Sequence, residues 1–279
     1  MHPVHWRLIQ DEAGGAAWNM ALDEALFESV AANAAPPVIR LYQWENPSVS
    51  LGRFQSLERT LAPIREDLPA AVSMVRRITG GRGILHGDDL TVSLAAPVAA
   101  LGLSNEIDLL SLYEALASGF VRAFRQLGID AAMGHCARGK TYDVRGDCFA
   151  TISQADLVDV ATGRKLLGAA LHRRADWFLQ QVSLPLHQRE TRDSYFRLRA
   201  SLFRGAVSEA PGSEFPDLSP SVVRSAIATG LAEALGGKLL LGAATSQEVA
   251  LAEQLCRERY ADSEWTAGKR KSLTAVAGN

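Results

Sequence analysis

The sequence predicts an α/β (α+β) fold with mixed, largely antiparallel sheets flanked by helices. Two clusters of short β-rich runs, separated by glycine, proline and asparagine turn signals, predict the sheets. Helical patterns lie before, between and after these clusters, so strands and helices alternate only irregularly. The chain has 279 residues, of which 47% are hydrophobic and 22% charged. It is therefore long enough to bury a core without disulfides.

In the first half of the chain, the pattern predicts strands over 4–10, 38–44, 49–52, 73–78 and 90–95, and helices over 16–30 and 104–127. Asn46-Pro47 separates the second and third strands, and a glycine-rich loop separates the fourth and fifth. We therefore expect hairpins at both places. The helix over 104–127 has apolar residues at helical spacing, with Ser104 or Asn105 as its cap and Gly128 as its stop.

In the second half, the pattern predicts strands over 149–152, 157–160, 165–172 and 178–184, and helices over 221–235 and 246–260. The segment 205–219 holds prolines, glycines and acids and is typical of a connector. We expect the tail after Trp265 to be frayed. The domain prediction is a main domain over 1–206 with a C-terminal helical extension over 207–279 packed on it.

Composition and charge exclude several classes of function. A formal charge of −2 and a pI near 6.3 argue against a nucleic-acid partner. Cys136, Cys148 and Cys256 include no CxxC pair, so spacing indicates neither a disulfide framework nor a zinc site. The N-terminus lacks the pattern of a signal peptide, and the uncharged stretch 90–105 is shorter than the ~20 apolar residues of a membrane helix. We expect a cytoplasmic protein that binds neither metal nor membrane.

Residues 134–141 read GHCARGKT and satisfy the phosphate-loop pattern GxxxxGK[ST]. In such loops a helix begins at the lysine and directs backbone N–H groups at phosphates. Here the next residues have no helical apolar face, and Gly146 precedes a β-rich run. We therefore interpret the segment as a basic surface loop.

The segment 76–86 is the first candidate site. It supplies the predicted substrate-binding residues Arg76, Arg77, Thr79, Gly80, Gly81, Arg82, Ile84 and His86. Glycine lets the backbone approach a ligand closely, and arginines can orient an anionic or polar head group. The alternative is a floppy turn with solvated charges. Taken alone, His86 is more often a structural histidine than a base.

Cys148 and Lys165, seventeen residues apart, form the second candidate site. A cysteine is mostly protonated at neutral pH, and a nearby ammonium favours the nucleophilic thiolate. The two side chains can meet if they lie on strands joined through an intervening strand and turn. The alternative is a buried, inert Cys148.

Together, these segments resemble a known family. The residues WNMALDEA at 18–25, LYQW at 41–44, PSVSLG at 47–52, RRITGGRGILH at 76–86, LTVS at 90–93, DCF at 147–149 and GRKLLG at 163–168 resemble, in the same order, the biotin/lipoate protein ligase catalytic domain. The end of the chain, 250–266, is similar to the tail of the octanoyltransferases of lipoate assembly. The resemblance covers about 5–267 and implies a biotin/lipoate ligase-like (class II synthetase-like) fold.

A cysteine followed by phenylalanine upstream of the GRK segment is similar to the cysteine-dependent octanoyltransferases. This resemblance implies that Cys148 takes an octanoyl group from octanoyl-acyl carrier protein as a thioester, and that Lys165 positions the carbonyl and supports charge. It adds Ser93, Gly168 and Ala169 to the predicted substrate-binding residues. The implied acceptor is a lysine of glycine cleavage H protein or of a lipoyl domain of a 2-oxoacid dehydrogenase, and no cofactor is expected, since thioester exchange needs no ATP.

The chain departs from the family pattern at two places. It reads Gly168-Ala169-Ala170-Leu171 where the family has glycine, serine, alanine and glutamine, and Gln181-Val182 where the family has histidine and glycine. Substrate choice is therefore open. An ATP-dependent lipoate-protein ligase and a non-catalytic acyl-binding member of the family are the alternatives.

The acidic partners that the resemblance implies favour a local basic face. The residues available for it are Arg76, Arg77, Arg82, Arg138, Lys140, Arg145, Arg164, Arg173 and Arg174. An ordinary solvated surface is the alternative.

Overall fold

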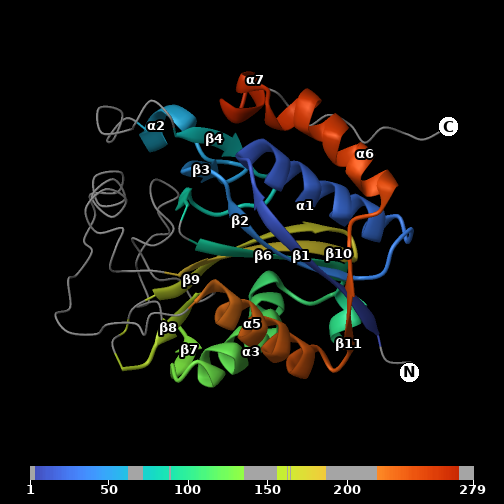
Figure 1. Ribbon diagram of the computed structural model, residues 1–279, viewed down its shortest axis with the longest axis vertical. Helices are drawn as coiled ribbons and strands as arrows, with labels where there is room; N and C mark the ends of the chain where they lie inside the picture. Colours follow the sequence, from blue (N-terminus) through green and yellow to red (C-terminus); the bar gives the residue numbers. More distant parts are fainter. Residues whose placement is uncertain are drawn as a thin grey trace.

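The computed structural model describes residues 4–61, 72–87, 89–134, 156–161, 163, 165–186 and 219–269. Within these ranges, a large mixed sheet lies between two layers of helices, and a small sheet packs beside it (Figure 1). The predicted fold class, sheets flanked by helices, is confirmed. Across the same ranges, every helix falls short of the length and apolar character that a bilayer crossing needs.

The main sheet has eight strands among the described residues. In spatial order they are β11 (Lys238–Gly242), β1 (His5–Gly14), β2 (Val38–Trp44), β6 (Asp89–Pro97), β10 (Trp177–Pro185), β9 (Lys165–Arg174), β8 (Leu157–Asp159) and β7 (Ala131–Met133). β11, β1 and β2 pair in parallel, and every other neighbour in the sheet pairs antiparallel. The sheet is therefore largely antiparallel, as expected.

The small sheet places β3 (Ser48–Leu51) between β4 (Ser73–Arg76) and β5 (Ile84–His86). β3 pairs in parallel with β4 and antiparallel with β5. The two predicted hairpins are wrong, because β2 and β3 belong to different sheets, as do β4 and β6. Turn residues show where the chain reverses, but they do not determine which strand it then joins.

Helices cover both faces of the main sheet (Figure 1). On one face lie α1 (Ala16–Ala31), α6 (Ser246–Leu255) with its π-helical continuation Cys256–Tyr260, and the short α7 (Ser263–Thr266). On the opposite face lie α3 (Leu109–Gln126) and α5 (Pro220–Leu235). Two shorter helices, α2 (Leu57–Leu61) and η2 (Val98–Leu101), complete the described set. Each face of the sheet thus has its own hydrophobic core.

Helix α3 begins later than predicted. Its N-cap is Asp108, whose carboxylate accepts a hydrogen bond from the Ser111 amide at 2.9 Å, rather than Ser104 or Asn105. An aspartate at this position satisfies one of the unpaired amides of the first turn and interacts favourably with the helix dipole. The predicted stop is confirmed, since Gly128 has a left-handed φ of 77° after the last turn.

The C-terminal segment is built into the body of the protein. β11, which sequence reasoning missed, pairs in parallel with β1, with Leu239 beside Trp6. The predicted helical extension therefore contains a strand, while the predicted boundary at 206 lies outside the described residues. The expectation of a frayed tail after Trp265 is wrong for residues 266–269, because Thr266 is buried and the turn is hydrogen-bonded through Lys269.

Helices α3 and α5 cross at two glycines. A Cβ on Gly230 would overlap the carbonyl oxygen of Gly119 and lie 2.6 Å from the backbone nitrogen of Ala123. A Cβ on Gly119 would lie 2.6 Å from a methyl group of Leu231. The crossing thus depends on the absence of side chains at both positions.

We expect Gly230→Ala to destabilise the protein by about 1–3 kcal/mol, because backbone atoms rather than a flexible side chain must move. The loss should outweigh the gain in helix propensity of about 1 kcal/mol. Urea denaturation measures the free energy of unfolding. Ser225→Ala, on an exposed position of the same helix, is the control and should stay within about 0.5 kcal/mol of the parent. Equal stability of Gly230→Ala and the parent would contradict the close crossing.

Candidate active site

The glycine loop, residues 77–83, connects β4 to β5 and lies against β9. The Gly80 amide donates to the Leu171 carbonyl at 3.2 Å, and a Cβ on Gly81 would lie 3.4 Å from the Cβ of Ala170. Gly81 has a φ of 81°, a left-handed conformation that favours glycine. At Gly80 and Gly81, the loop backbone therefore lies close to the protein's own strand β9, where the sequence predicted a close approach to a ligand.

Arg77 supports the glycine loop from within. Its Nε donates to the Thr79 hydroxyl at 3.0 Å, and its terminal nitrogens donate to the carbonyls of Gly80, Arg82 and Ser50 at 2.7, 2.7 and 3.0 Å. A planar guanidinium with five donors can bind several acceptors at once. The side chain thus holds the shape of the loop, and a direct contact of Arg77 with substrate stays a prediction.

The other two arginines of the motif are buried as well. Arg76, Arg77 and Arg82 have exposed fractions of 0, 3 and 5%. Arg76 reaches away from the glycine loop, toward carbonyls of the C-terminal residues Trp265 and Thr266. The alternative of a floppy turn with solvated charges is therefore wrong, and so is the expectation that all three arginines share one surface.

His86 is held by three neighbours. Its Nδ1 lies 2.8 Å from an Asp89 carboxylate oxygen, its Nε2 lies 2.7 Å from the Ser50 hydroxyl, and its ring stacks on Trp44 at 3.8 Å. Because the Asp89 carboxylate only accepts hydrogen bonds, Nδ1 carries a proton and donates it to Asp89. Arg77 donates to the same Ser50 hydroxyl at 3.1 Å. Both ring nitrogens are therefore engaged within the protein, which agrees with a structural histidine.

Asp89 is buried at the end of this chain of hydrogen bonds. Burial alone would raise the pKa of its carboxyl group, but the attraction of His86 and hydrogen bonds from His86, Ser183 and the Gly87 amide together lower that pKa. The Ser183 hydroxyl donates at 2.6 Å and the Thr91 hydroxyl at 3.1 Å. Asp89 is thus a carboxylate at neutral pH and links β5, β6 and β10.

A second buried carboxylate, Asp23 of α1, accepts four hydrogen bonds. The donors are Arg40 and Tyr42 of β2, Ser93 of β6 and Gln181 of β10, at 2.9, 2.7, 2.8 and 2.7 Å. Burial and the Asp23 charge raise the pKa of Tyr42 well above its usual value, so its phenol remains a donor. Ser93, a predicted substrate-binding residue, therefore belongs to this polar layer between α1 and the main sheet.

Gln181 connects that polar layer to the glycine loop. Its Nε2 donates to Asp23, and its Oε1 accepts from the Thr79 hydroxyl at 2.7 Å. In the sequence, Gln181 stands out only as a departure from the family pattern, and nothing assigns a role to Asp23. The available signal was the presence of three polar residues, Asn19, Asp23 and Glu24, in a largely apolar helix. All three are buried.

Lys165, the first residue of β9, forms a buried ion pair. Its Nζ lies 2.8 Å from an Asp156 carboxylate oxygen, and both side chains are 4% exposed. Cys148 lies outside the described residues, as do most of the residues 134–141 that resemble a phosphate loop. The meeting of Cys148 and Lys165 therefore stays a prediction. Asp156 had no signal in the sequence, because its role depends on the pairing of β8 with β9.

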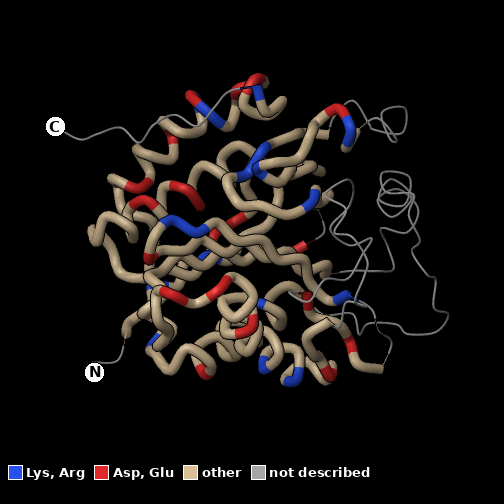
Figure 2. Tube along the Cα trace, turned by 180° about the vertical axis from the view of Figure 1, so that it is seen from behind, with Lys and Arg blue, Asp and Glu red and all other residues tan. Residues whose placement is uncertain are grey.

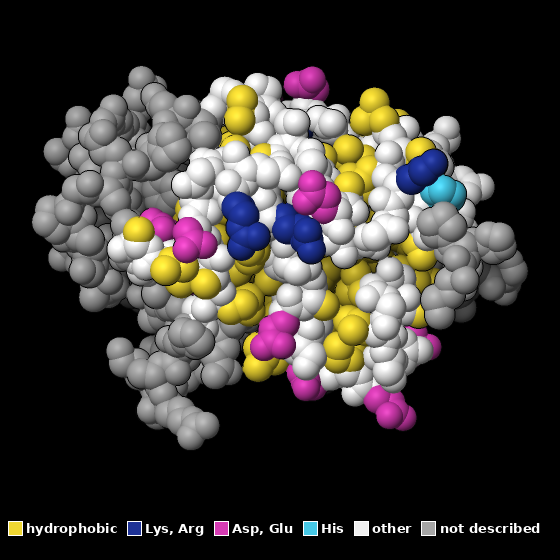
Figure 3. All heavy atoms as spheres, turned by 90° about the horizontal axis from the view of Figure 1, so that it is seen from below, with side chains coloured by type: hydrophobic (Ala, Val, Ile, Leu, Met, Phe, Trp, Pro, Cys, Tyr) yellow, Lys and Arg dark blue, Asp and Glu magenta, His cyan; other side chains and the backbone are white. Residues whose placement is uncertain are grey.

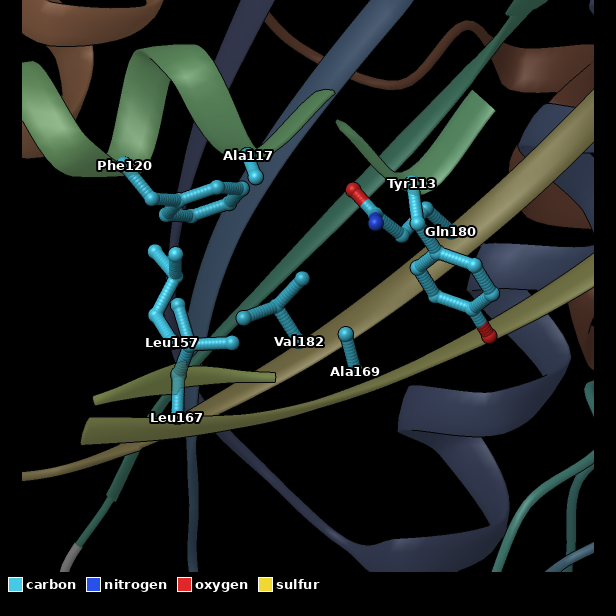
Figure 4. A pocket seen from close by; sticks show the side chains of 8 residues that line it. All are labelled: Tyr113, Ala117, Phe120, Leu157, Leu167, Ala169, Gln180 and Val182. Atoms are coloured by element: carbon cyan, nitrogen blue, oxygen red, sulfur yellow. The ribbon is translucent and has the colours of Figure 1, made fainter. Parts of the chain in front are cut away.

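The two remaining predicted residues of β9 face opposite ways. Gly168 pairs with Ser183, whose hydroxyl binds Asp89. Ala169 instead points toward α3, into a pocket that also holds Tyr113, Ala117, Phe120, Leu157, Leu167, Gln180 and Val182 (Figure 4). Successive residues of a strand face opposite sides of the sheet. The sheet therefore separates Ala169 from the glycine loop, contrary to the expectation that they line one site. Ile84, another predicted substrate-binding residue, is buried in β5.

The expected basic face does not form from the described residues. Arg76, Arg77 and Arg82 are buried. Arg174 is paired with Glu28 at 2.7 Å, and Arg173 donates to the carbonyls of Asn105 and Ile107. Figures 2 and 3 show charges of both signs mixed along the described trace and over the face below α3 and α5. Arg138, Lys140, Arg145 and Arg164 lie outside the described residues. In the part of the chain that the structure describes, no cluster of three metal-binding side chains occurs.

Comparison with known proteins identifies relatives along nearly the whole chain. The model of the lipoyl protein ligase A/B catalytic domain matches residues 15–201. Octanoyltransferase LipM of Carboxydothermus hydrogenoformans is 32% identical over 273 residues, which cover 93% of this chain and 97% of that protein. Octanoyltransferase LipM of Kyrpidia tusciae is 34% identical over 288 residues, covering 95% and 99%.

A solved structure has the same fold. The bi-partite lipoate protein ligase from Thermoplasma acidophilum superposes with a TM-score of 0.71 and 23% identity over 97% of this chain and 100% of that chain. At this identity, the likeness supports the fold and not the activity.

We expect Asp89→Asn to make the stability of the protein less dependent on acid pH. A lowered folded-state pKa means that the carboxylate stabilises the fold above its unfolded pKa of about 3.9, and that this stabilisation is lost as pH falls through the folded value. At pH 7 the variant should be less stable by about 1–3 kcal/mol, and the difference should shrink below about pH 4. Urea denaturation from pH 3 to 7 measures both effects. The exposed control Asp130→Asn should leave the pH profile unchanged, and a parallel profile for Asp89→Asn would contradict the assignment.

Proposed function

The chain belongs to the lipoyl protein ligase A/B catalytic domain family, and we propose that within this family it is an octanoyltransferase. The observation that carries the proposal is its similarity to octanoyltransferases LipM over 93–95% of its own length and 97–99% of theirs. We propose octanoyl-acyl carrier protein as the donor. The acceptor that we propose is the lysine of a lipoyl domain or of glycine cleavage H protein. The bi-partite lipoate protein ligase from T. acidophilum belongs, with its E2 lipoyl domain, to an archaeal lipoylation system.

The proposed reaction has two steps of acyl transfer. The Cys148 thiolate attacks the carbonyl carbon of the donor thioester, the bond to the carrier sulfur breaks, and the carrier sulfur takes up the proton that the Cys148 thiol had lost. The ε-amine of the acceptor lysine then attacks the Cys148 thioester, forming an amide and returning the sulfur with the proton that the amine releases. Because one thioester replaces another and the amide is the more stable product, this sequence consumes no nucleotide.

We assign to Lys165 the role of stabilising the negative charge that develops on the carbonyl oxygen during acyl transfer. A buried ammonium is costly unless a carboxylate compensates it, and Asp156 is placed at 2.8 Å to do so. The ion pair thus keeps a positive charge at the start of β9, three residues before Gly168 on the strand that supports the glycine loop. We place the octanoyl group against that loop, on the α1 face of the main sheet.

We expect the full-length protein, incubated with octanoyl-acyl carrier protein, to carry an octanoyl adduct on Cys148, because the thioester intermediate forms on that sulfur. Intact-mass and peptide mass spectrometry measure it. Cys148→Ala should abolish the adduct, and Cys256→Ser is the matched control. Burial raises the pKa of the Cys256 thiol, so it is a poor nucleophile and its loss should change nothing. Labelling that requires ATP and persists in Cys148→Ser would instead identify a ligase.

A second prediction concerns the buried ion pair. Lys165→Met should lower the rate of Cys148 alkylation by iodoacetamide at pH 7 by about tenfold, because the thiolate loses a favourable charge. Asp156→Asn removes the carboxylate charge that lies 2.8 Å from the ammonium and should lower stability by about 3–5 kcal/mol. Peptide mass spectrometry measures alkylation, with Cys256 as the internal control, and urea denaturation measures stability. Unchanged Cys148 alkylation in Lys165→Met would remove Lys165 from the mechanism.

A further inference from the structure

Arg76 joins the C-terminal residues to the part of the molecule that carries the glycine loop. Its side chain is fully buried. The Nε donates to the carbonyls of Trp265 and Thr266 at 3.1 and 3.0 Å, and a terminal nitrogen donates again to Thr266 at 2.7 Å. In return, the Trp265 indole N–H donates to the Arg76 carbonyl at 2.8 Å. The end of β4 and the α7 turn are thus bonded in both directions.

The other terminal nitrogen of Arg76 binds the turn that follows β3. It donates to the carbonyls of Gly52, Arg53 and Gln55 at 2.8, 3.2 and 2.7 Å. Among the described residues no carboxylate pairs with this guanidinium, so backbone carbonyls compensate its charge. One buried cation therefore fixes two segments that are more than 200 residues apart in the chain.

The 52–55 turn also supports the glycine loop. The Arg53 amide donates to the Thr79 carbonyl at 2.8 Å. A Cβ on Gly52 would overlap the Gly81 carbonyl, so the two backbones are in direct contact. The Arg53 guanidinium also lies 4.5 Å from the centre of the Trp265 ring. Displacement of Arg76 would therefore be transmitted to Thr79 and Gly81.

The C-terminal residues are shaped to present their carbonyls to Arg76. Gly268 has a φ of 76° just after α7, and its amide donates to the Trp265 carbonyl at 2.9 Å. A Cβ on Gly268 would lie 3.3 Å from a terminal nitrogen of Arg76. The backbone conformation at this position favours glycine, and the absence of a Cβ leaves room for the Arg76 guanidinium.

We propose that Arg76 is a positioning residue for acyl transfer, through which the C-terminal turn 263–268 holds the 52–55 turn and, with it, the glycine loop. The proposal rests on the proposed function in that the glycine loop is taken to bind the acyl donor. It assigns no contact between Arg76 and substrate, which corrects the substrate-binding role predicted from the sequence. It also makes residues beyond the catalytic-domain match at 15–201 part of the site.

Amide hydrogen exchange on the full-length protein tests the mechanical link without requiring activity. Arg76→Lys keeps the charge but lacks the planar fork, and Gly268→Ala strains the turn beside it. Both variants should raise exchange in 52–55 and 79–83 by about tenfold or more. Gly268→Ala, at the surface end of the contact, provides the test if Arg76→Lys does not fold. Unchanged exchange in 79–83 while 263–269 exchanges faster would overturn the proposal.

Kinetics distinguish positioning from general stabilisation. In both variants the KM for octanoyl-acyl carrier protein should rise about tenfold, with a smaller change in kcat, at a temperature where each variant is folded. Tyr260→Phe is the matched control, because it removes a buried hydrogen bond that the same C-terminal segment makes to Glu24 of α1. It should lower stability but leave KM and exchange in 79–83 unchanged; an equal rise in KM for all three variants would overturn the proposal. If no protein forms an acyl adduct, the proposed function fails, while the exchange data still decide the link.

Discussion

The buried carboxylate of Asp23 is the constraint on which the architecture of the site depends. A charge with no exposure to water must be compensated by donors, and here four side chains from three neighbouring strands converge on it. Each donor fixes the position of its own strand relative to α1. Gln181, one of these donors, also accepts a hydrogen bond from the Thr79 hydroxyl. Arg77 donates to that hydroxyl and to carbonyls of the glycine loop. The loop is therefore connected to the buried Asp23 carboxylate through a continuous series of hydrogen bonds.

The two adjacent arginines divide the support of that loop. Arg76 ends β4 and Arg77 begins the glycine loop, and as neighbours along an extended backbone their side chains point in opposite directions. Arg77 binds carbonyls within the glycine loop, whereas Arg76 binds carbonyls of the 52–55 turn and of the C-terminal residues. In the sequence, this pair of arginines suggests anion binding. In the structure, both guanidinium groups donate hydrogen bonds to backbone carbonyls instead. This use explains why neither side chain is exposed.

Local pattern was sufficient for most elements of the fold. The helix that Gly128 ends and the strands around 38–44, 165–172 and 178–184 follow from periodicity and turn residues, which act over a few positions. Strand pairing and the strand at 238–242 did not follow, because they depend on contacts between distant segments. For the same reason, the glycine loop was found as a motif, but the partners of its residues were not. Asp23, Asp156 and Gln181 acquire their roles only when α1, β8 and β10 are brought beside other strands.

The division of the molecule into two faces accounts for where the polar residues can lie. The α3 face of the main sheet packs a large apolar cluster, which includes Phe120, Phe178 and Leu184, and its burial stabilises the fold. The α1 face holds the paired but costly charges of Asp23, Arg40 and Asp89. Holding reacting groups in the right geometry lowers the barrier of a group-transfer reaction. A hydrogen-bonded polar layer under a glycine loop, with an apolar core on the opposite face, is suited to that kind of positioning.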